Sequence, residues 1–257
     1  MDWVAEFYST TGGWWGRAEA EITERDHRRL RLLHEHAGER PLRVLELGSG
    51  YGTTAAVMAR AGHAVTAVEV SDRVEFAGRF TRDVEPGALT VVRADFYEVD
   101  LPRDFDVVCY WNGFGVGCDA DQRRLLTRIA GEWLRPGGTA LIDVFNPFVW
   151  ARWDGDEEHR LPDPAAGYDH ELRERIRFDP VTCTAIDTWW PVADPERAIS
   201  QVLRCYSPAD LALLLTGTGL ALAKIHVGEH AFAPAARPGP RDLLHDHHEY
   251  LAVCRSS

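Results

Sequence analysis

The sequence predicts an α/β fold built on a mostly parallel, seven-stranded sheet with helices on both faces and a small antiparallel β insertion. Between residues 43 and 144, short apolar runs alternate with longer amphipathic ones. The short runs lack a regular alternation of polar and apolar residues, which is typical of strands buried on both faces. Such strands, separated by helical segments, favour parallel pairing through helical crossovers.

The elements of the first half follow one another in a regular order. Residues 1–40 precede the sheet and predict one or two helices. The expected strands are 43–47, 64–69, 89–92, 105–110 and 139–144. The expected helices are 53–60, 72–83 and 121–134, the last ending before Pro136-Gly137-Gly138.

The regular alternation stops after Asn146. Residues 147–166 are rich in proline, glycine, tryptophan and aspartate, and predict a loop. Two or three antiparallel strands follow, at 172–178, 183–190 and 199–205. A helix then begins at Ser207-Pro208, because serine is a favoured N-cap and proline a favoured first helical residue. The last strands are expected at 220–227 and 249–254.

These elements divide the chain into three parts. An N-terminal helical segment, 1–40, is expected to cover the ligand cleft. Residues 41–146 and 207–257 form the core, and residues 147–206 form an antiparallel cap inserted into it. Loops at the carboxyl edge of a parallel sheet surround the ligand site, so an insertion after the fifth strand begins on the side where a ligand binds.

Charge and composition exclude several kinds of partner. The 257 residues include 40 acidic and 28 basic side chains, a formal net charge of −12, which disfavours nucleic acid and anionic membranes. The five cysteines are scattered, and no leader or membrane-spanning run is visible, so we expect a cytoplasmic protein with reduced thiols. The histidine-rich tract 245–248 lies in a polar loop, so no metal site is expected.

The strongest motif is the turn Glu46-Leu47-Gly48-Ser49-Gly50-Tyr51-Gly52 between the first strand and the first helix. Glycines allow the backbone to approach a ligand, and a helix N-terminus offers unpaired N–H groups. A dinucleotide fingerprint, G-x-G-x-x-G, requires glycine where this sequence has Thr53. The spacing therefore disfavours a nicotinamide cofactor.

Acidic residues follow the next two strands. Glu69, followed by Val70, closes the second strand and is placed to accept hydrogen bonds from both hydroxyls of an adenosine ribose. Asp95, followed by Phe96, lies just beyond the third strand. Because ligands bind at the carboxyl ends of parallel strands, the turn and both acids are expected at one site.

An acid before G-x-G-x-G, together with these strand-end acids, resembles the class I, Rossmann-like S-adenosylmethionine-dependent methyltransferases over residues 40–146 and 207–254. The resemblance implies S-adenosylmethionine as cofactor and S-adenosylhomocysteine as product. It also implies that an acid at Asp95 accepts from the adenine amino group and that Phe96 packs on the ring. The implied cofactor-binding residues are Tyr8, Glu46, Gly48, Ser49, Gly50, Gly52, Glu69, Val70, Asp95, Phe96 and Trp111.

The resemblance extends in looser form to the insertion. The stretch from Arg177 to Leu211 is similar to the antiparallel cap of small-molecule methyltransferases, including the glycine and aminosugar N-methyltransferases. In those relatives a tyrosine of the N-terminal segment, here Tyr8, reaches the methionine end of the cofactor or the acceptor. Tyr8 and His170 are the candidate catalytic residues for orienting or deprotonating the acceptor. The candidate substrate-binding residues are Asn112, Asn146, Trp150, Trp189 and Arg204.

The expected function is methyl transfer to a small-molecule acceptor in specialised, natural-product metabolism. Tryptophans concentrate in the N-terminal segment and the insertion, which favours an aromatic pocket for an apolar or planar acceptor. Two alternatives are a nucleotide-linked oxidoreductase and a catalytically inactive, cofactor-binding partner subunit. The acceptor atom, whether oxygen, nitrogen or carbon, is left open, as is the choice between monomer and homodimer.

Overall fold

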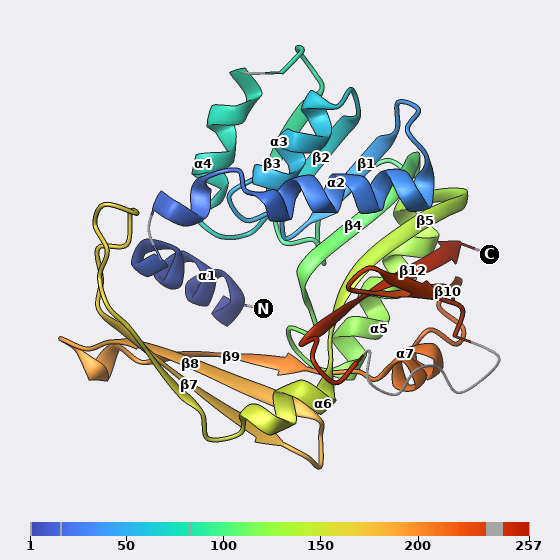
Figure 1. Cartoon of the computed structure of the whole chain (residues 1–257). Helices are drawn as coiled ribbons and strands as arrows, with labels where there is room; N and C mark the ends of the chain where they lie inside the picture. The colour runs from blue at the N-terminus through green and yellow to red at the C-terminus, as the bar shows by residue number, and fades with distance from the viewer. Residues whose placement is uncertain (1, 16, 83, 235–243, 257) are drawn as a thin grey trace.

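The computed structural model describes residues 2–15, 17–82, 84–234 and 244–256, which form two sheets with helices around the larger one (Figure 1). The larger sheet has the strand order β11-β10-β12-β5-β4-β1-β2-β3. Its strands are β1 (Arg43–Leu47), β2 (Ala64–Glu69), β3 (Leu89–Arg93), β4 (Phe105–Phe114), β5 (Leu134–Phe145), β10 (Leu220–Val227), β11 (His230–Phe232) and β12 (Glu249–Ser256).

Strands β1 to β5 are parallel, whereas β12 runs antiparallel to both β5 and β10. The chain first builds the sheet outward through β2 and β3 and then returns to place β4 on the other side of β1. The carboxyl ends of β1 and β4 therefore lie at the point where the strand order reverses. Open α/β sheets bind their ligands at such a point.

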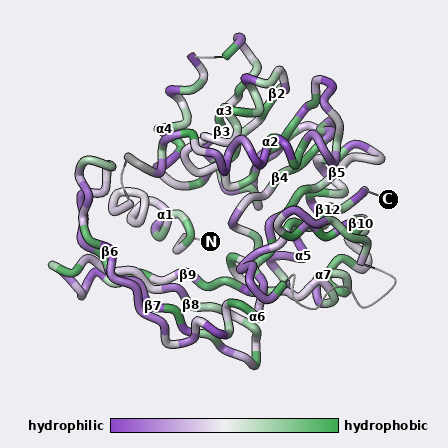
Figure 2. The backbone as a smooth tube through the Cα atoms, in the orientation of Figure 1, coloured by the Kyte–Doolittle hydropathy of each residue, from purple (hydrophilic) through white to green (hydrophobic). Residues whose placement is uncertain are grey.

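Helices cover both faces of this sheet (Figure 1). The segments are α1 (Asp2–Trp15), η1 (Arg17–Ala20), α2 (Glu24–Ala37), α3 (Thr53–Arg60), α4 (Val74–Ala77), η2 (Gly78–Arg82), α5 (Asp119–Arg128), η3 (Ile129–Trp133), α6 (Pro147–Trp150), η4 (Ala151–Trp153), η5 (Pro195–Arg197) and α7 (Pro208–Leu214). One apolar core joins α5 and α7 to the sheet, and a second joins α2 and α3 to the opposite face. Figure 2 shows a largely hydrophilic α2, as expected of a surface helix. Among the described residues, none of the helices has the length and apolar character that a bilayer span requires.

The second sheet is the antiparallel cap. It contains β6 (Glu157–Arg160), β7 (Leu172–Asp179), β8 (Thr184–Pro191) and β9 (Ile199–Arg204), in that order. Helix α1 lies between the cap and the larger sheet (Figure 1). Phe7 and Trp14 of α1 form an apolar cluster with Leu172 and Trp189 of the cap, so the N-terminal segment and the insertion bury each other.

The cap is joined closely to the end of β4. The backbone N–H of Arg204 in β9 donates to the carbonyl of Gly115 at 2.7 Å. A Cβ on Gly115 would lie 2.3 Å from the Arg204 carbonyl oxygen, and its φ is +114°. Only glycine permits this close approach, which fixes the cap above the sheet.

The predicted fold class is confirmed, with differences in detail. The sheet has eight strands rather than seven, because the short β11 pairs with β10. The expected loop 147–166 contains α6, η4 and β6. The helix expected at 72–83 is the short α4 followed by the 3-10 turn η2, and Asp83 lies outside the described residues. Ser207 caps α7 as predicted, accepting a hydrogen bond from the Asp210 N–H.

Two strands are longer than the sequence suggested. Strand β4 continues to Phe114, although Asn112 adopts a positive φ of +50°. Strand β5 begins at Leu134 rather than at 139, because Leu134 pairs with Phe105 before a register shift. The expected helix 121–134 is accordingly α5 and the π-helical η3, which together end at Trp133.

Candidate active site

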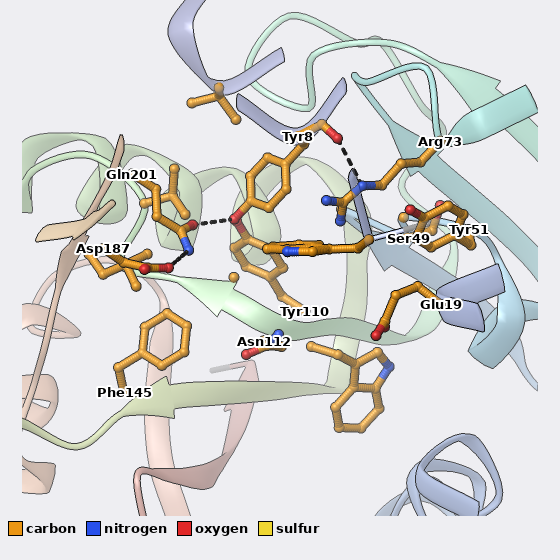
Figure 3. Close-up of a pocket in the computed structure, with 18 of the residues that line it drawn as sticks. Tyr8, Glu19, Ser49, Tyr51, Arg73, Tyr110, Asn112, Phe145, Asp187 and Gln201 are labelled. Atoms are coloured by element: carbon orange, nitrogen blue, oxygen red, sulfur yellow. Dashed lines mark hydrogen bonds between the residues drawn. The ribbon is translucent and has the colours of Figure 1, made fainter. Parts of the chain in front are cut away.

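A cavity of about 520 Å³ lies between the carboxyl ends of the central strands, helix α1 and the cap (Figure 3). This volume is within the range of small-molecule sites, roughly 300–1,000 Å³. Its walls come from the glycine-rich turn after β1, the ends of β2 to β4, and the inner face of the cap. Segments far apart in the sequence therefore meet at one pocket.

Gly50 presents bare backbone to this pocket. Its φ is +54°, and a Cβ placed on it would have no heavy atom within 4 Å, apart from its chain neighbours. Gly48, with a φ of +58°, also lines the pocket, but there a Cβ would lie 3.1 Å from the ring of Tyr110. The turn thus leaves open space at Gly50, where the motif predicts that the backbone approaches a ligand.

Gly52 has a different role from the one expected. It is not among the residues that line the pocket, and a Cβ on it would lie 2.6 Å from the Cβ of Ala77. Its φ of +76° places it as the N-cap of α3, where it lets α4 pack closely. The predicted contact between Gly52 and the cofactor is therefore replaced by a packing role.

Glu69 ties the turn to the second strand. Its Oε2 accepts a hydrogen bond from the Gly50 N–H at 2.7 Å, and its Oε1 accepts from the Ser71 N–H at 2.8 Å. The side chain is buried, and both Glu69 and Val70 line the pocket. Each carboxylate oxygen has a second lone pair, so Glu69 can accept further hydrogen bonds from a ligand.

Asp95 and Phe96 lie side by side at the next strand end, and both line the pocket. The Asp95 Oδ1 accepts from the Tyr97 N–H at 2.8 Å, which fixes the carboxylate in a turn after β3. The Phe96 ring meets Tyr110 of β4 edge-on, with 5.4 Å between ring centroids. A polar acceptor thus stands beside an aromatic surface, an arrangement suited to a planar heterocycle.

Three polar atoms at the end of the pocket formed by the sheet are buried without a hydrogen-bond partner within the described residues. They are the Oε2 of Glu46, the Oγ of Ser49 and the Nε1 of Trp111. All three residues line the cavity. Burial raises the pKa of Glu46 to about 8, although Arg29 opposes the shift. Buried polar atoms are normally satisfied, so these indicate the place of a polar ligand.

Tyr8 projects from α1 into the pocket (Figure 3). Its hydroxyl donates to the Oε1 of Gln201 at 3.0 Å, and the Nε2 of Gln201 donates to the Oδ2 of Asp187 at 2.7 Å. Burial raises the pKa of Tyr8 well above its ordinary value, against the opposing charge of Arg73. Tyr8 therefore remains a protonated donor at neutral pH.

Arg73 holds Tyr8 in place. Its Nε donates to the Tyr8 carbonyl at 2.9 Å, and its guanidinium lies about 5 Å from the ring centroids of Tyr8, Trp15 and Tyr51. Such cation–π contacts orient the three aromatic side chains around the half-buried Arg73 guanidinium. Sequence reasoning did not find Arg73, because it lies in a segment where an ordinary amphipathic helix was expected.

The cap contributes one face of strands β7 to β9. Trp189 and Trp150 line the pocket as predicted, and so do Asp187 and Gln201, which the sequence analysis did not propose. Trp189 packs edge-on against Trp15, with 5.2 Å between centroids. Asp187 is two residues before Trp189 and so lies on the same face of the strand. The two-residue repeat of a β-strand could therefore have identified Asp187 as a pocket residue from the sequence.

Asn112 also lines the pocket, and its backbone N–H donates to the Oδ2 of Asp143 at 3.3 Å. Asn146 does not line it. The Asn146 side chain is completely buried, accepts from the Phe148 N–H, and donates to the carbonyls of Leu244 and His247. Asn146 therefore ties α6 to the loop before β12 and is corrected from a substrate ligand to a structural one.

Arg204 and His170 are also displaced from their expected roles. The Arg204 Nε pairs with the Oδ1 of Asp119 at 2.8 Å, and its guanidinium lies over Tyr206, so it joins β9 to α5 outside the pocket. His170 is exposed two residues before β7 and does not line the pocket, because the turn carries it into solvent. Neither residue remains a candidate for contact with the acceptor.

A cluster of potential metal ligands lies outside the pocket, in α2 and β10. Ligand atoms of Glu35, His36 and His226 lie within 4.8 Å of one another. Both ring nitrogens of His36 are buried without a hydrogen-bond partner among the residues that the structure describes. Burial lowers the pKa of His36 and of His226, so both rings are neutral at pH 7. The prediction of no metal site stays a prediction.

A family model described as a methyltransferase domain matches residues 17–225. The cypemycin N-terminal methyltransferase of a Streptomyces species is 35% identical over 118 residues. This match covers 44% of the chain and 46% of that protein, so it spans less than half the length of the curated relative.

Solved structures resemble the whole chain. The CcbJ methyltransferase from Streptomyces caelestis has a TM-score of 0.70 at 23% identity, and the match covers 100% of this chain and 97% of that one. An S-adenosylmethionine-dependent methyltransferase from Clostridium acetobutylicum has a TM-score of 0.68 at 12% identity, with 93% and 94% covered. At these identities the likeness establishes the fold.

Proposed function

The chain belongs to the methyltransferase domain family, and from that premise we propose that it transfers the methyl group of S-adenosylmethionine to a small-molecule acceptor held under the cap. The resemblance and the fold class predicted from the sequence are both confirmed. The observation that carries the proposal is the meeting of Gly50, Glu69 and Asp95 at one pocket. No observation favours a nucleotide-linked oxidoreductase.

The residues present fit the methyl donor. Glu69 offers its remaining lone pairs to ribose hydroxyls, and Asp95 with Phe96 offers an acceptor and a ring surface to adenine. Glu46 and Ser49 contribute the unpartnered polar atoms that an amino acid end would satisfy. We therefore assign cofactor binding to the predicted residues other than Gly52, with Tyr8 and Trp111 at the boundary to the acceptor.

Methyl transfer requires the protein mainly to align the acceptor atom with the methyl group and the sulfur. S-adenosylmethionine supplies a methyl group already activated by a positively charged sulfur. The side chains then have to position an acceptor and exclude water, and positioning alone contributes roughly 7–11 kcal/mol to lowering such a barrier. Tyr8 positions its neighbours rather than acting as a base, because its raised pKa keeps the hydroxyl protonated and Gln201 accepts that proton in a hydrogen bond.

We assign the acceptor half of the pocket to α1 and the cap, within the predicted segments 1–40 and 147–206. Trp150 and Trp189 provide apolar walls, and Asn112 contributes from the end of β4. The acidic net charge of −12 supports a small molecule over nucleic acid or membrane. The natural-product names of the similar proteins support specialised metabolism, and we place the reaction in the cytoplasm.

Calorimetric titration directly tests the donor half of the pocket, which contains Gly50, Glu69 and Asp95. We expect S-adenosylmethionine and S-adenosylhomocysteine to bind and NAD to give no heat of binding. Binding of NAD without binding of either methionine cofactor would refute the proposal. Release of S-adenosylhomocysteine with an acceptor then separates an active enzyme from an inactive partner subunit.

A further inference from the structure

Two carboxyl groups lie together on the inner face of the cap. Strands β7 and β8 pair so that Glu174 is opposite Trp189 and Ile176 is opposite Asp187. Glu174 and Asp187 are therefore diagonal neighbours on the same face, within reach of each other. Both line the pocket, and Asp187 is only 4% exposed.

The pair, one buried and one half-buried carboxyl group, has few cationic or hydrogen-bonding partners. The Oδ2 of Asp187 accepts from Gln201, but its Oδ1 has no hydrogen-bond partner in the described part of the chain. The guanidinium of Arg160 lies 3.9 Å from Glu174, at the outer limit of an ion pair. Glu158 stands opposite Glu174 on β6 and adds negative charge to the same wall.

The electrostatics follow from burial and proximity. Burial raises the pKa of Glu174, and the charge of Asp187 raises it further, whereas Arg160 lowers it. Burial likewise raises the pKa of Asp187, against the hydrogen bond from Gln201. Two neighbouring carboxyl groups disfavour each other's charged form, and a bound cation offsets that repulsion. The cap therefore presents an acidic site that a cation would complete.

We propose that Glu174 and Asp187 bind a cationic amino group of the acceptor, so that the methyl acceptor is an amine. This inference rests on the proposed function. Trp15 and Trp189 border the pocket and suit an apolar or ring-bearing amine. Gln201 is a positioning residue, because it links the Asp187 carboxylate to the Tyr8 hydroxyl (Figure 3).

The transfer balances with the groups present. The ammonium loses one proton to the Glu174–Asp187 pair, which leaves a lone pair on nitrogen. That lone pair forms the new N–C bond while the C–S bond breaks, and the electrons of the broken bond remain on sulfur as a neutral thioether. The product leaves as a methylated ammonium, and the carboxyl pair then releases its proton to solvent.

The test compares three probes with one skeleton, 2-phenylethylamine, 2-phenylethanol and 3-phenylpropanoate. Each is titrated calorimetrically into protein saturated with S-adenosylhomocysteine, in two buffers of different ionisation enthalpy. We expect the amine to bind at least about tenfold more tightly than the alcohol, the lower end expected of one charge-assisted hydrogen bond. Its binding should release protons, because the ammonium displaces the proton that the pair shares.

Matched variants locate the effect. Asp187→Asn and Glu174→Gln should each remove the preference for the amine while S-adenosylhomocysteine binds as in the wild type. Asp194→Asn and Glu196→Gln change exposed acids outside the pocket and should retain the preference. These controls carry the same loss of charge without touching the inner face of the cap.

The outcomes separate this inference from the proposed function. Equal binding of the alcohol, absence of amine binding, or a preference that survives in either pocket variant would overturn the amine site. In each of those cases intact binding of S-adenosylhomocysteine leaves the methyltransferase proposal standing. Failure of the wild type to bind S-adenosylhomocysteine would instead overturn the proposed function itself.

Discussion

Substitution of Gly50 by alanine separates ligand contact from backbone strain. A Cβ at this position enters open space in the pocket, at a φ of +54°. The left-handed conformation costs alanine about 1–2 kcal/mol of stability, with no added clash. We therefore expect Gly50→Ala to fold with a modest loss of stability and to bind S-adenosylhomocysteine at least about tenfold more weakly, because the methyl group takes up ligand space.

Two further glycines serve as controls. Gly62 has a φ of +93° and open space around it, so Gly62→Ala carries strain alone. Gly52→Ala adds a contact of 2.6 Å with the Cβ of Ala77 to its own strain, and overpacking costs a further 1–3 kcal/mol, approximately. Gly52→Ala should therefore lose about 2–5 kcal/mol of stability in total.

Urea unfolding and calorimetric titration on the same samples measure the two effects. Gly50→Ala should match Gly62→Ala in stability and differ from it in affinity, while Gly52→Ala should be the least stable of the three. Wild-type affinity in a folded Gly50→Ala protein would show that this turn does not meet a ligand, and the assignment of the donor half would fail.

Three other changes have expected outcomes. Glu69→Ala should weaken binding of S-adenosylhomocysteine more than tenfold, as measured by calorimetry. It should also lower the melting temperature, since both carboxylate oxygens accept backbone hydrogen bonds worth about 1.5–3 kcal/mol each. Unchanged affinity would show that Glu69 has only a structural role. Trp189→Ala should cost about 3–5 kcal/mol in urea unfolding, because the ring is 3% exposed and packs against α1, and a fully stable variant would contradict this. Burial lowers the pKa of His36 and of His226, so at these two sites the unfolded chain binds protons that the folded chain does not, and their contribution to stability should fall as the pH drops below about 6.5. Unfolding measured at neutral and acidic pH should show a smaller loss in His36→Leu, and an identical loss would exclude His36 as a cause.

The residues that we assign to the donor half of the pocket could be proposed from the sequence because their signals are local. The turn Gly48 to Gly52 and the acids Glu69 and Asp95 each stand at the end of a strand that the apolar pattern predicts. Parallel strands bring those ends together without any further information. Gly52 was misassigned because the sequence does not reveal that α4 approaches it within van der Waals contact.

The acceptor half depends on contacts between distant segments, which no local pattern encodes. Asn146 was proposed just before the insertion and Arg204 on its inner face, yet tertiary hydrogen bonds and an ion pair turn both away from the pocket. Asp187 and Glu174 acquire their significance from the register of β7 against β8. A single sequence indicates that the strands exist but does not give their register.

The two halves are connected through one chain of contacts. Arg73, which precedes α4 in the core, binds the carbonyl of Tyr8, whose hydroxyl reaches Gln201 and through it Asp187 (Figure 3). The groups that we propose for donor binding lie at the ends of packed parallel strands, whereas the acidic pair lies on the cap, which can vary without disturbing them. Because Tyr8 touches both halves, a change in the cap that alters the acceptor need not alter the donor, provided that this contact survives. We therefore expect β7 to β9 to determine acceptor specificity, and the turn after β1 to determine binding of the methyl donor.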